Sequence, residues 1–232
     1  MELNEEQKKQ IAFQTAKLRH GNYKTNIDLG EGVVLQDFVV QENTLAPEKM
    51  TALYFARWLL ANKKIYKNKE VLDLGCGSGI QGIVMGLNGA KKVVFSDIAK
   101  PSVENTLLNV KHFGIEEKST VLQGDLFEKV NGKFDIIEFN HPFFPDVGDK
   151  SDFISLATRD DGKLIRRFFE KAKDYLKLSG KIIMPFFEKA GPTNNPLVQA
   201  PKYGYQIFES FSENIETELH AGKASVYVIG LK

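Results

Sequence analysis

The sequence predicts an α/β protein built on a doubly wound, mostly parallel sheet. From residue 70 onward, β-like segments alternate with helix-like segments, which is typical of parallel strands joined by right-handed crossover helices. The strand candidates are 70–74, 92–96, 120–123, 134–139 and 181–185, and the helix candidates between them are 79–88, 101–113 and 163–178. With 232 residues, of which 42% are hydrophobic, the chain can bury one large core of this kind.

The two ends of the chain depart from the alternation. Residues 205–211 and 225–231 are β-rich runs with no long helix between them, which predicts an antiparallel C-terminal hairpin at one edge of the sheet. The N-terminal part carries a helix-like segment at 3–19 and a β-like segment at 32–40. We therefore expect residues 1–40 to form an appendage and residues 41–232 to form the main domain, which begins with a helix near 47–62.

Composition narrows the function classes. The net charge is +1, whereas a dedicated nucleic-acid-binding protein usually carries a stronger basic excess. The single cysteine excludes an internal disulfide and a cysteine-based metal cluster, and the four histidines lack metal-ligand spacing. The first residues resemble neither a signal nor a transit peptide, and no apolar run is long enough to span a membrane. We expect a cytoplasmic, soluble protein without a metal site; the sequence predicts no particular oligomeric state.

A glycine-rich turn follows the first predicted strand of the sheet. It belongs to the segment Val71-Leu-Asp-Leu-Gly-Cys-Gly-Ser-Gly-Ile80. Gly75, Gly77 and Gly79 leave the backbone bare at the carboxyl end of a strand, where doubly wound sheets bind their ligands. The turn therefore predicts a binding site for a nucleotide-like cofactor.

Acidic residues end the next two predicted strands. Asp97 and the neighbouring Ile98 follow the second strand, where a carboxylate is well placed to accept hydrogen bonds from ribose hydroxyls. Asp125 and Leu126 follow the third strand, where a carboxylate can meet the exocyclic amine of an adenine ring. Both pairs are candidate cofactor-binding residues.

Two cofactors compete for this pattern. Residues 77–82 formally satisfy G-x-G-x-x-G, the fingerprint of NAD enzymes. The acidic Asp73 ahead of closely spaced glycines instead resembles the first motif of class I methyltransferases, which bind S-adenosylmethionine (SAM). That resemblance implies a seven-stranded Rossmann-like fold, places Asp73 near the methionine amino group, and includes Cys76 in the cofactor turn rather than as a nucleophile. We favour SAM over NAD, because the predicted terminal hairpin also fits the methyltransferase fold.

A second motif follows the fourth predicted strand. Asn140-His-Pro-Phe143 resembles the Asn-Pro-Pro-Tyr/Phe motif of methyltransferases that act on planar amide or amino nitrogens. A planar nitrogen is a poor nucleophile because its lone pair is delocalised, so catalysis depends on aiming it and stabilising the developing positive charge. The resemblance implies that the Asn140 amide oxygen and a backbone carbonyl accept the nitrogen's two hydrogens. It also implies that Pro142 shapes the loop and that the ring of Phe143 packs on the acceptor.

His141 stands where that motif has its first proline. This exchange removes some loop rigidity and introduces a titratable group. The sequence leaves three roles open for His141: contact with substrate, participation in proton handling, or coverage of the pocket.

Residues 70–189 resemble the glutamine N5-methyltransferases that modify peptide-release factors, together with their relatives that act on nucleic acids. We therefore expect a SAM-dependent N-methyltransferase whose acceptor is a protein glutamine amide, ahead of an RNA or DNA base or a small molecule. The non-enzymatic alternative is a SAM-binding regulatory protein. The nearest match to the Arg-Pro-x-Thr-Glu segment of the glutamine enzymes is Leu45-Ala-Pro-Glu-Lys49, so the acceptor is the open part of the prediction.

Overall fold

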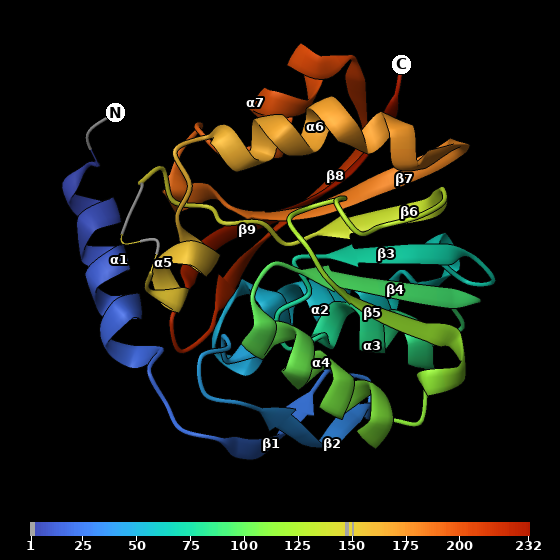
Figure 1. Cartoon of the computed structure of the whole chain (residues 1–232). Helices are drawn as coiled ribbons and strands as arrows, with labels where there is room; N and C mark the ends of the chain where they lie inside the picture. The colour runs from blue at the N-terminus through green and yellow to red at the C-terminus, as the bar shows by residue number, and fades with distance from the viewer. Residues whose placement is uncertain (1–2, 147–148, 150) are drawn as a thin grey trace.

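A seven-stranded sheet forms the centre of the molecule (Figure 1). The computed structural model describes residues 3–146, 149 and 151–232. Across the sheet the strands lie in the order β5 (Ser119–Gln123), β4 (Lys92–Asp97), β3 (Glu70–Leu74), β6 (Phe134–Phe139), β7 (Leu176–Phe187), β9 (Ala221–Leu231) and β8 (Tyr205–Glu216). The doubly wound sheet predicted from the alternation of strands and helices is confirmed.

Strand order creates a switch point between β3 and β6. The chain runs outward from β3 to β4 and β5, and then returns to place β6 on the other side of β3. Strands β5, β4, β3, β6 and β7 are parallel, whereas β9 is antiparallel to both β7 and β8. The predicted C-terminal hairpin therefore exists, and β9 is the strand that lies against the sheet. Ligands of doubly wound sheets bind at such a switch point, beyond the carboxyl ends of the strands.

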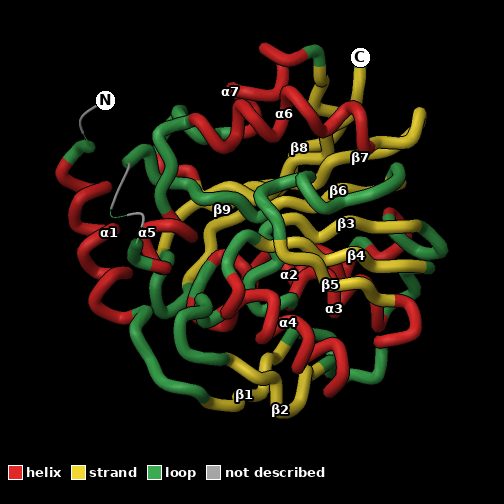
Figure 2. Tube along the Cα trace, viewed as in Figure 1, coloured by secondary structure: helices red, strands yellow, loops and turns green. Residues whose placement is uncertain are grey.

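Helices cover both faces of the sheet (Figures 1 and 2). One face carries α2 (Thr51–Ala61), α3 (Ile80–Leu87) and α4 (Lys100–His112), and the other carries α6 (Lys163–Tyr175) with the short α7 (Pro196–Gln199). The sequence of α6 explains why this helix packs on the sheet. Its buried residues recur at helical spacing, so one apolar stripe faces the sheet: Ile165, Phe168, Phe169 and Ala172. The remaining turns are 3-10 helices at Pro47–Lys49, Lys63–Ile65, Glu116–Lys118, Glu188–Ala190 and Ala200–Tyr203.

The N-terminal segment contains a helix and a separate hairpin. Helix α1 (Glu5–Lys17) lies beside the main sheet, and β1 (Tyr23–Asp28) pairs with β2 (Val34–Val40). Two buried asparagines of α4 join β2 to the main sheet's helical layer: Asn105 and Asn109 each donate from Nδ2 to the carbonyl oxygen of Val39, at 2.8 and 2.9 Å. The hairpin therefore packs on α4 through hydrogen bonds from asparagine side chains of the helix to the backbone of β2.

Several element boundaries differ from those expected. Helix α6 ends at Tyr175 rather than 178, because Leu176 has extended backbone angles and begins a twelve-residue β7. The helix expected at 47–62 is a 3-10 turn followed by α2. Strand β1 and helix α5 (Phe153–Thr158) were not predicted; β1 alternates partly buried and exposed positions, and α5 has only six residues.

Within the described residues, no helix combines the length and the apolar character needed to cross a lipid bilayer.

Candidate active site

One cavity of about 380 Å³ opens at the switch point and collects segments from four strand ends. Among its lining residues are nearly all the predicted site residues: Gly75, Cys76, Gly77, Asp97, Ile98, Asp125, Leu126, Asn140, His141, Pro142 and Phe143. They come together because the carboxyl ends of parallel strands meet at the same edge of the sheet. Asp73 and Gly79 do not line the cavity.

The glycine turn adopts a backbone that only glycine enters without strain. Gly75, Gly77 and Gly79 have φ angles of +67°, +55° and +83°. The turn is held from the next strand, since Ser96 accepts hydrogen bonds from the backbone N–H groups of Gly75 (2.7 Å) and Cys76 (3.2 Å). A Cβ placed on Gly77 would meet no protein atom within 4 Å, so the space beside its backbone is open.

Gly79 and Gly82 serve packing rather than ligand contact. Gly79 ends the turn through a 2.7 Å hydrogen bond from its N–H to the Cys76 carbonyl oxygen, and a Cβ there would lie 3.0 Å from the Thr106 side chain. Gly82 lies inside α3, where a Cβ would overlap the ring of Phe95. The third glycine of the formal dinucleotide fingerprint is therefore explained by close packing of a helix on the sheet.

The Asp97 carboxylate is oriented by backbone donors. Its Oδ2 accepts from Gly77 N–H at 2.9 Å and its Oδ1 accepts from Ala99 N–H at 2.8 Å. Burial raises the pKa of this carboxyl, while the hydrogen bonds from Ala99 and Gly77 oppose the rise. The carboxylate thus joins the ends of β3 and β4 at the cavity wall.

The third strand end bears an ion pair. Asp125 Oδ2 accepts from Arg167 Nη2 of α6 at 2.6 Å, and both side chains are partly exposed. Leu126, next along the chain, has a positive φ of 50°, and Ile98 is exposed beside the cavity.

Cys76, in the glycine turn, is buried. Its Sγ lies 3.3 Å from Thr106 Oγ1, and burial raises the pKa of its thiol well above the usual value. A thiol in that state is a poor nucleophile.

Asp73 lies beneath the cavity instead of in its wall. Its Oδ2 accepts from Gly82 N–H at 2.8 Å, and its register partner on β6 is Glu138. Both carboxyls are buried, at 1% and 0% exposure. Burial raises the pKa of Asp73 to about 6, and burial together with the negative charge of Asp73 raises the pKa of Glu138 well above its usual value. The sequence analysis did not select Glu138, although a glutamate within an apolar strand could have indicated a buried carboxyl group.

The loop after β6 brings its four predicted residues to the opposite wall of the cavity. Asn140 is partly buried, whereas His141, Pro142 and Phe143 are buried. The His141 ring packs among Phe139, Phe143 and Phe186, with centroid distances of 5.6, 5.3 and 6.1 Å. Its Nε2–H donates to the carbonyl oxygen of Asn194 at 2.7 Å, and burial lowers its pKa to about 4. His141 is therefore neutral at physiological pH.

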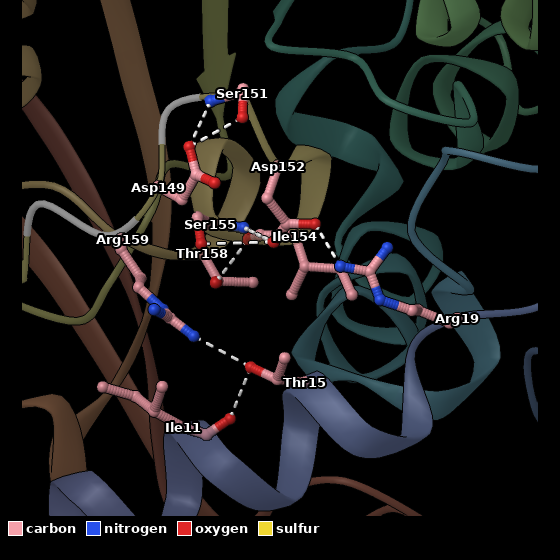
Figure 3. Close-up of polar contacts among 10 residues, drawn as sticks. All are labelled: Ile11, Thr15, Arg19, Asp149, Ser151, Asp152, Ile154, Ser155, Thr158 and Arg159. Atoms are coloured by element: carbon pink, nitrogen blue, oxygen red, sulfur yellow. Dashed lines mark hydrogen bonds and ion pairs between the residues drawn. The ribbon is translucent and has the colours of Figure 1, made fainter.

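Helix α5 forms a further part of the cavity wall and is held by α1. Phe153, Leu156 and Ala157 of α5 line the cavity. Figure 3 shows contacts between the two helices and the residues that flank them: Arg159, after α5, donates to Thr15 Oγ1 of α1 at 2.8 Å, and Arg19, after α1, pairs with Asp152, which caps α5. The N-terminal segment thus contributes to the site by fixing a wall of the cavity.

The residues present fit a SAM-sized ligand. The open space beside Gly77 would be filled by any Cβ, so only a glycine leaves room there for a ligand against the backbone. Carboxylates at Asp97 and Asp125 provide acceptors for hydroxyl and amine groups, and Asn140 lines the same cavity. Within the described part of the chain, no group of three or more histidine, cysteine, aspartate or glutamate side chains is arranged to hold a metal ion.

Two relatives with similar sequences are both described as methyltransferases. A putative protein N5-glutamine methyltransferase of Methanocaldococcus jannaschii is 35% identical over 129 residues, which cover 53% of this chain and 64% of the relative. A ribosomal RNA small subunit methyltransferase C of Mannheimia succiniciproducens is 38% identical over 128 residues, covering 53% of this chain and 34% of the relative. This chain thus matches less than two thirds of the length of either relative.

The fold has close counterparts among solved structures. The 16S rRNA N2 G1207 methyltransferase of T. Thermophilus, solved with AdoMet and guanosine, superposes with a TM-score of 0.64 at 18% identity, covering 92% of this chain and 51% of that one. Residues 54–195 match the family described as methyltransferase small domain, which is more than half of the chain. The chain therefore belongs to the methyltransferase small domain family and has the class I fold of SAM-dependent methyltransferases.

Proposed function

We propose that the chain is a SAM-dependent N-methyltransferase that acts on a planar amide or amino nitrogen, with a protein glutamine side chain as the favoured acceptor. One observation carries the proposal: Asn140, directly after β6, lines the same cavity as the glycine turn after β3 and Asp97 at the end of β4. A cofactor site and a hydrogen-bond acceptor for a planar nitrogen thus share one enclosure.

Residues of the first three strand ends would hold the cofactor. The bare backbone of Gly77 admits close approach, two N–H donors orient the Asp97 carboxylate, and Asp125 lines the same cavity. When bound, SAM supplies a methyl group on a positively charged sulfur, so that a C–S bond breaks as a C–N bond forms.

The loop after β6 positions the methyl acceptor. The Asn140 amide oxygen and a neighbouring carbonyl oxygen accept hydrogens of the planar nitrogen, which orients its lone pair and stabilises the positive charge that develops on it. Phe143 provides an aromatic wall for a flat group. The nitrogen then releases one proton to solvent, and His141 is not required to take it, because the ring is buried and its pKa is lowered to about 4, which makes it a weak base.

Two considerations favour a glutamine amide. The M. jannaschii relative is described as a putative protein N5-glutamine methyltransferase, and the nearly neutral net charge of +1 suits a protein acceptor better than a phosphate backbone. An RNA or DNA base is the second candidate, because the M. succiniciproducens relative is described as a ribosomal RNA methyltransferase. The soluble, cytoplasmic character expected from the sequence belongs to the same proposal.

The test is transfer of labelled methyl from SAM into host lysate, with the products divided by protease and nuclease digestion. Asn140→Ala is the control variant, and it should lose turnover by about 100-fold while its affinity for SAM changes little. Label removed by protease supports the glutamine proposal, and its position in the digested peptides tests the residue type. Label removed by nuclease moves the acceptor to a base, and label that survives in a small molecule contradicts both. SAM binding without any Asn140-dependent transfer would indicate a regulatory SAM-binding protein.

A further inference from the structure

The acceptor loop, residues 139–144, is held from two sides by one neighbouring residue, Asn194. The side chain of Asn194 is fully buried, and its Nδ2 donates to the carbonyl oxygens of Phe143 (3.2 Å) and Asp160 (2.6 Å). Its own carbonyl oxygen accepts the hydrogen bond from His141 Nε2 at 2.7 Å. Asn194 therefore binds the loop at two positions that flank Pro142.

The chemistry of these contacts defines the state of His141. A carbonyl oxygen can only accept, so Nε2 carries the proton and the neutral ring has its lone pair on Nδ1. The Nδ1 atom is buried, which separates it from anything in the cavity. The ring is packed almost parallel to Phe186, with an interplanar angle of 14°, and edge-on to Phe143 at 78°. Side-chain rotation is thus opposed both by packing and by a hydrogen bond.

The loop is also tied to the segment before α6. Phe144 N–H donates to the Thr158 carbonyl oxygen at 3.1 Å, and Asp160 N–H donates to the Phe144 carbonyl oxygen at 2.9 Å. Because Asn194 binds the carbonyl of Asp160 as well, it joins the acceptor loop and this second segment in one buried network. Buried hydrogen bonds restrict the geometry of the groups that they connect; within the described residues, Asn194 Oδ1 is the atom of this side chain that is buried without a hydrogen-bond partner.

On this basis, and resting on the proposed function, we propose that His141 and Asn194 are positioning residues that clamp the acceptor loop and hold Asn140 at the angle needed for methyl transfer. The clamp supplies the rigidity that a proline at position 141 would otherwise provide, through contacts distant in sequence rather than through a ring in the backbone. Neither residue acts on the methyl group. This assigns a role to Asn194 and gives His141 a positioning role in addition to the three roles that the sequence left open for it.

Four variants test the clamp. His141→Phe keeps an aromatic ring but removes the donor to Asn194, and His141→Gln restores an N–H donor on a flexible side chain. Asn194→Ala removes both side-chain hydrogen bonds, and Asn195→Ala is its matched control, because the adjacent, buried Asn195 instead caps α7 by accepting from Leu197 N–H. If His141→Phe does not fold, Asn194→Ala tests the same loop from its other side.

The expected pattern separates positioning from folding and from cofactor binding. His141→Phe and Asn194→Ala should lower kcat by about 10- to 100-fold, since small displacements of a reacting group have effects of that order. Their Kd for SAM should stay within about twofold of the wild-type value, because these contacts do not reach the glycine turn. His141→Gln and Asn195→Ala should retain kcat within about threefold.

A second measurement does not depend on activity. Backbone amide exchange at the non-proline positions of residues 140–144 should become faster in His141→Phe and Asn194→Ala but not in His141→Gln or Asn195→Ala. If that pattern appears and the wild-type protein transfers no methyl group, the clamp stands and the proposed function fails. If methyl transfer is robust and kcat is unchanged in both disruptive variants, the function stands and the clamp is overturned.

Two other results would also overturn the clamp. A parallel loss of SAM affinity and kcat would assign the residues to cofactor binding. A wild-type kcat that falls with decreasing pH between 8 and 5, and that becomes flat in His141→Gln, would make His141 a proton-transfer group. Positioning predicts the same pH profile for the two proteins.

Discussion

Asp97 Oδ2 accepts a 2.9 Å hydrogen bond from the backbone N–H of Gly77, so the carboxylate at the end of β4 directly orients the glycine turn after β3. Two features found separately in the sequence are thus one structural unit. Cofactor affinity should depend on both members of this pair, and each can be changed by itself.

Gly77→Ala should weaken SAM binding by at least about tenfold, because the added methyl group occupies open space at the cavity wall. The substitution also strains the backbone, since φ is +55°, at a cost of about 1–2 kcal/mol. Gly114→Ala is a matched control: its φ is +66° and a Cβ there also meets nothing within 4 Å, but Gly114 lies outside the cavity lining. Calorimetric titration with SAM should show a loss of affinity for the first variant only.

Asp97→Asn should reduce SAM affinity by about tenfold as well. An amide has one oxygen, so the N–H of Gly77 or of Ala99 loses its acceptor and faces a donor instead; hydrogen bonds to charged groups contribute about 1.5–3 kcal/mol. Equilibrium binding of SAM measures the effect. An unchanged Kd would contradict a role for Asp97 in SAM binding, whether by direct contact or through the glycine turn.

Glu138→Gln should alter how stability depends on pH. The folded-state pKa of Glu138 is raised by burial and by Asp73, so the folded protein retains a proton that the unfolded chain releases above about pH 4.5. The contribution of Glu138 to the stability of the wild-type protein therefore falls as pH rises from its unfolded-state pKa towards its folded-state pKa. The glutamine of Glu138→Gln does not titrate, so this loss of stability is absent from the variant. The free energy of unfolding of Glu138→Gln relative to wild type should increase between pH 5 and pH 8. Glu117→Gln, at an exposed glutamate, should show no such trend.

Asn109→Ala should destabilise the protein by about 2–3 kcal/mol, because it removes the side-chain partner of the Val39 N–H and of the Ser78 carbonyl oxygen and leaves the Val39 carbonyl oxygen with Asn105 Nδ2 as its side-chain donor. Asn109 accepts from Val39 N–H at 2.9 Å and donates to the carbonyl oxygens of Val39 (2.9 Å) and Ser78 (3.0 Å). Asn88→Ala is the control, since Nδ2 of Asn88 donates to the carbonyl oxygen of Val84, which belongs to the helix that Asn88 itself ends. Urea unfolding should separate the two variants, and equal losses would contradict a role for Asn109 in docking the β1–β2 hairpin.

Local pattern was enough to predict the sheet, the glycine turn and the acceptor motif. Short, nearly continuous apolar runs ended by glycine or aspartate mark buried parallel strands, and the residues after those strands must meet at one edge. Residues 70–74 and 134–139 were located at their observed bounds, as β3 and β6, and the class I fold and its family are confirmed. The roles of Asn140, Asp97 and Asp125 remain predictions.

What only the tertiary structure decided are the contacts between segments distant in the chain. Sequence spacing cannot show that Asn194 reaches His141 and Phe143, that Asn109 binds β2, or that Asp73 faces Glu138 instead of the cavity. These relationships depend on how strand order and helix packing bring the segments together. The sequence by itself determined the elements and the chemistry that each one offers, whereas the environment of each side chain, and with it the neutral state of His141 and the raised pKa of Glu138, arises from burial in the folded protein.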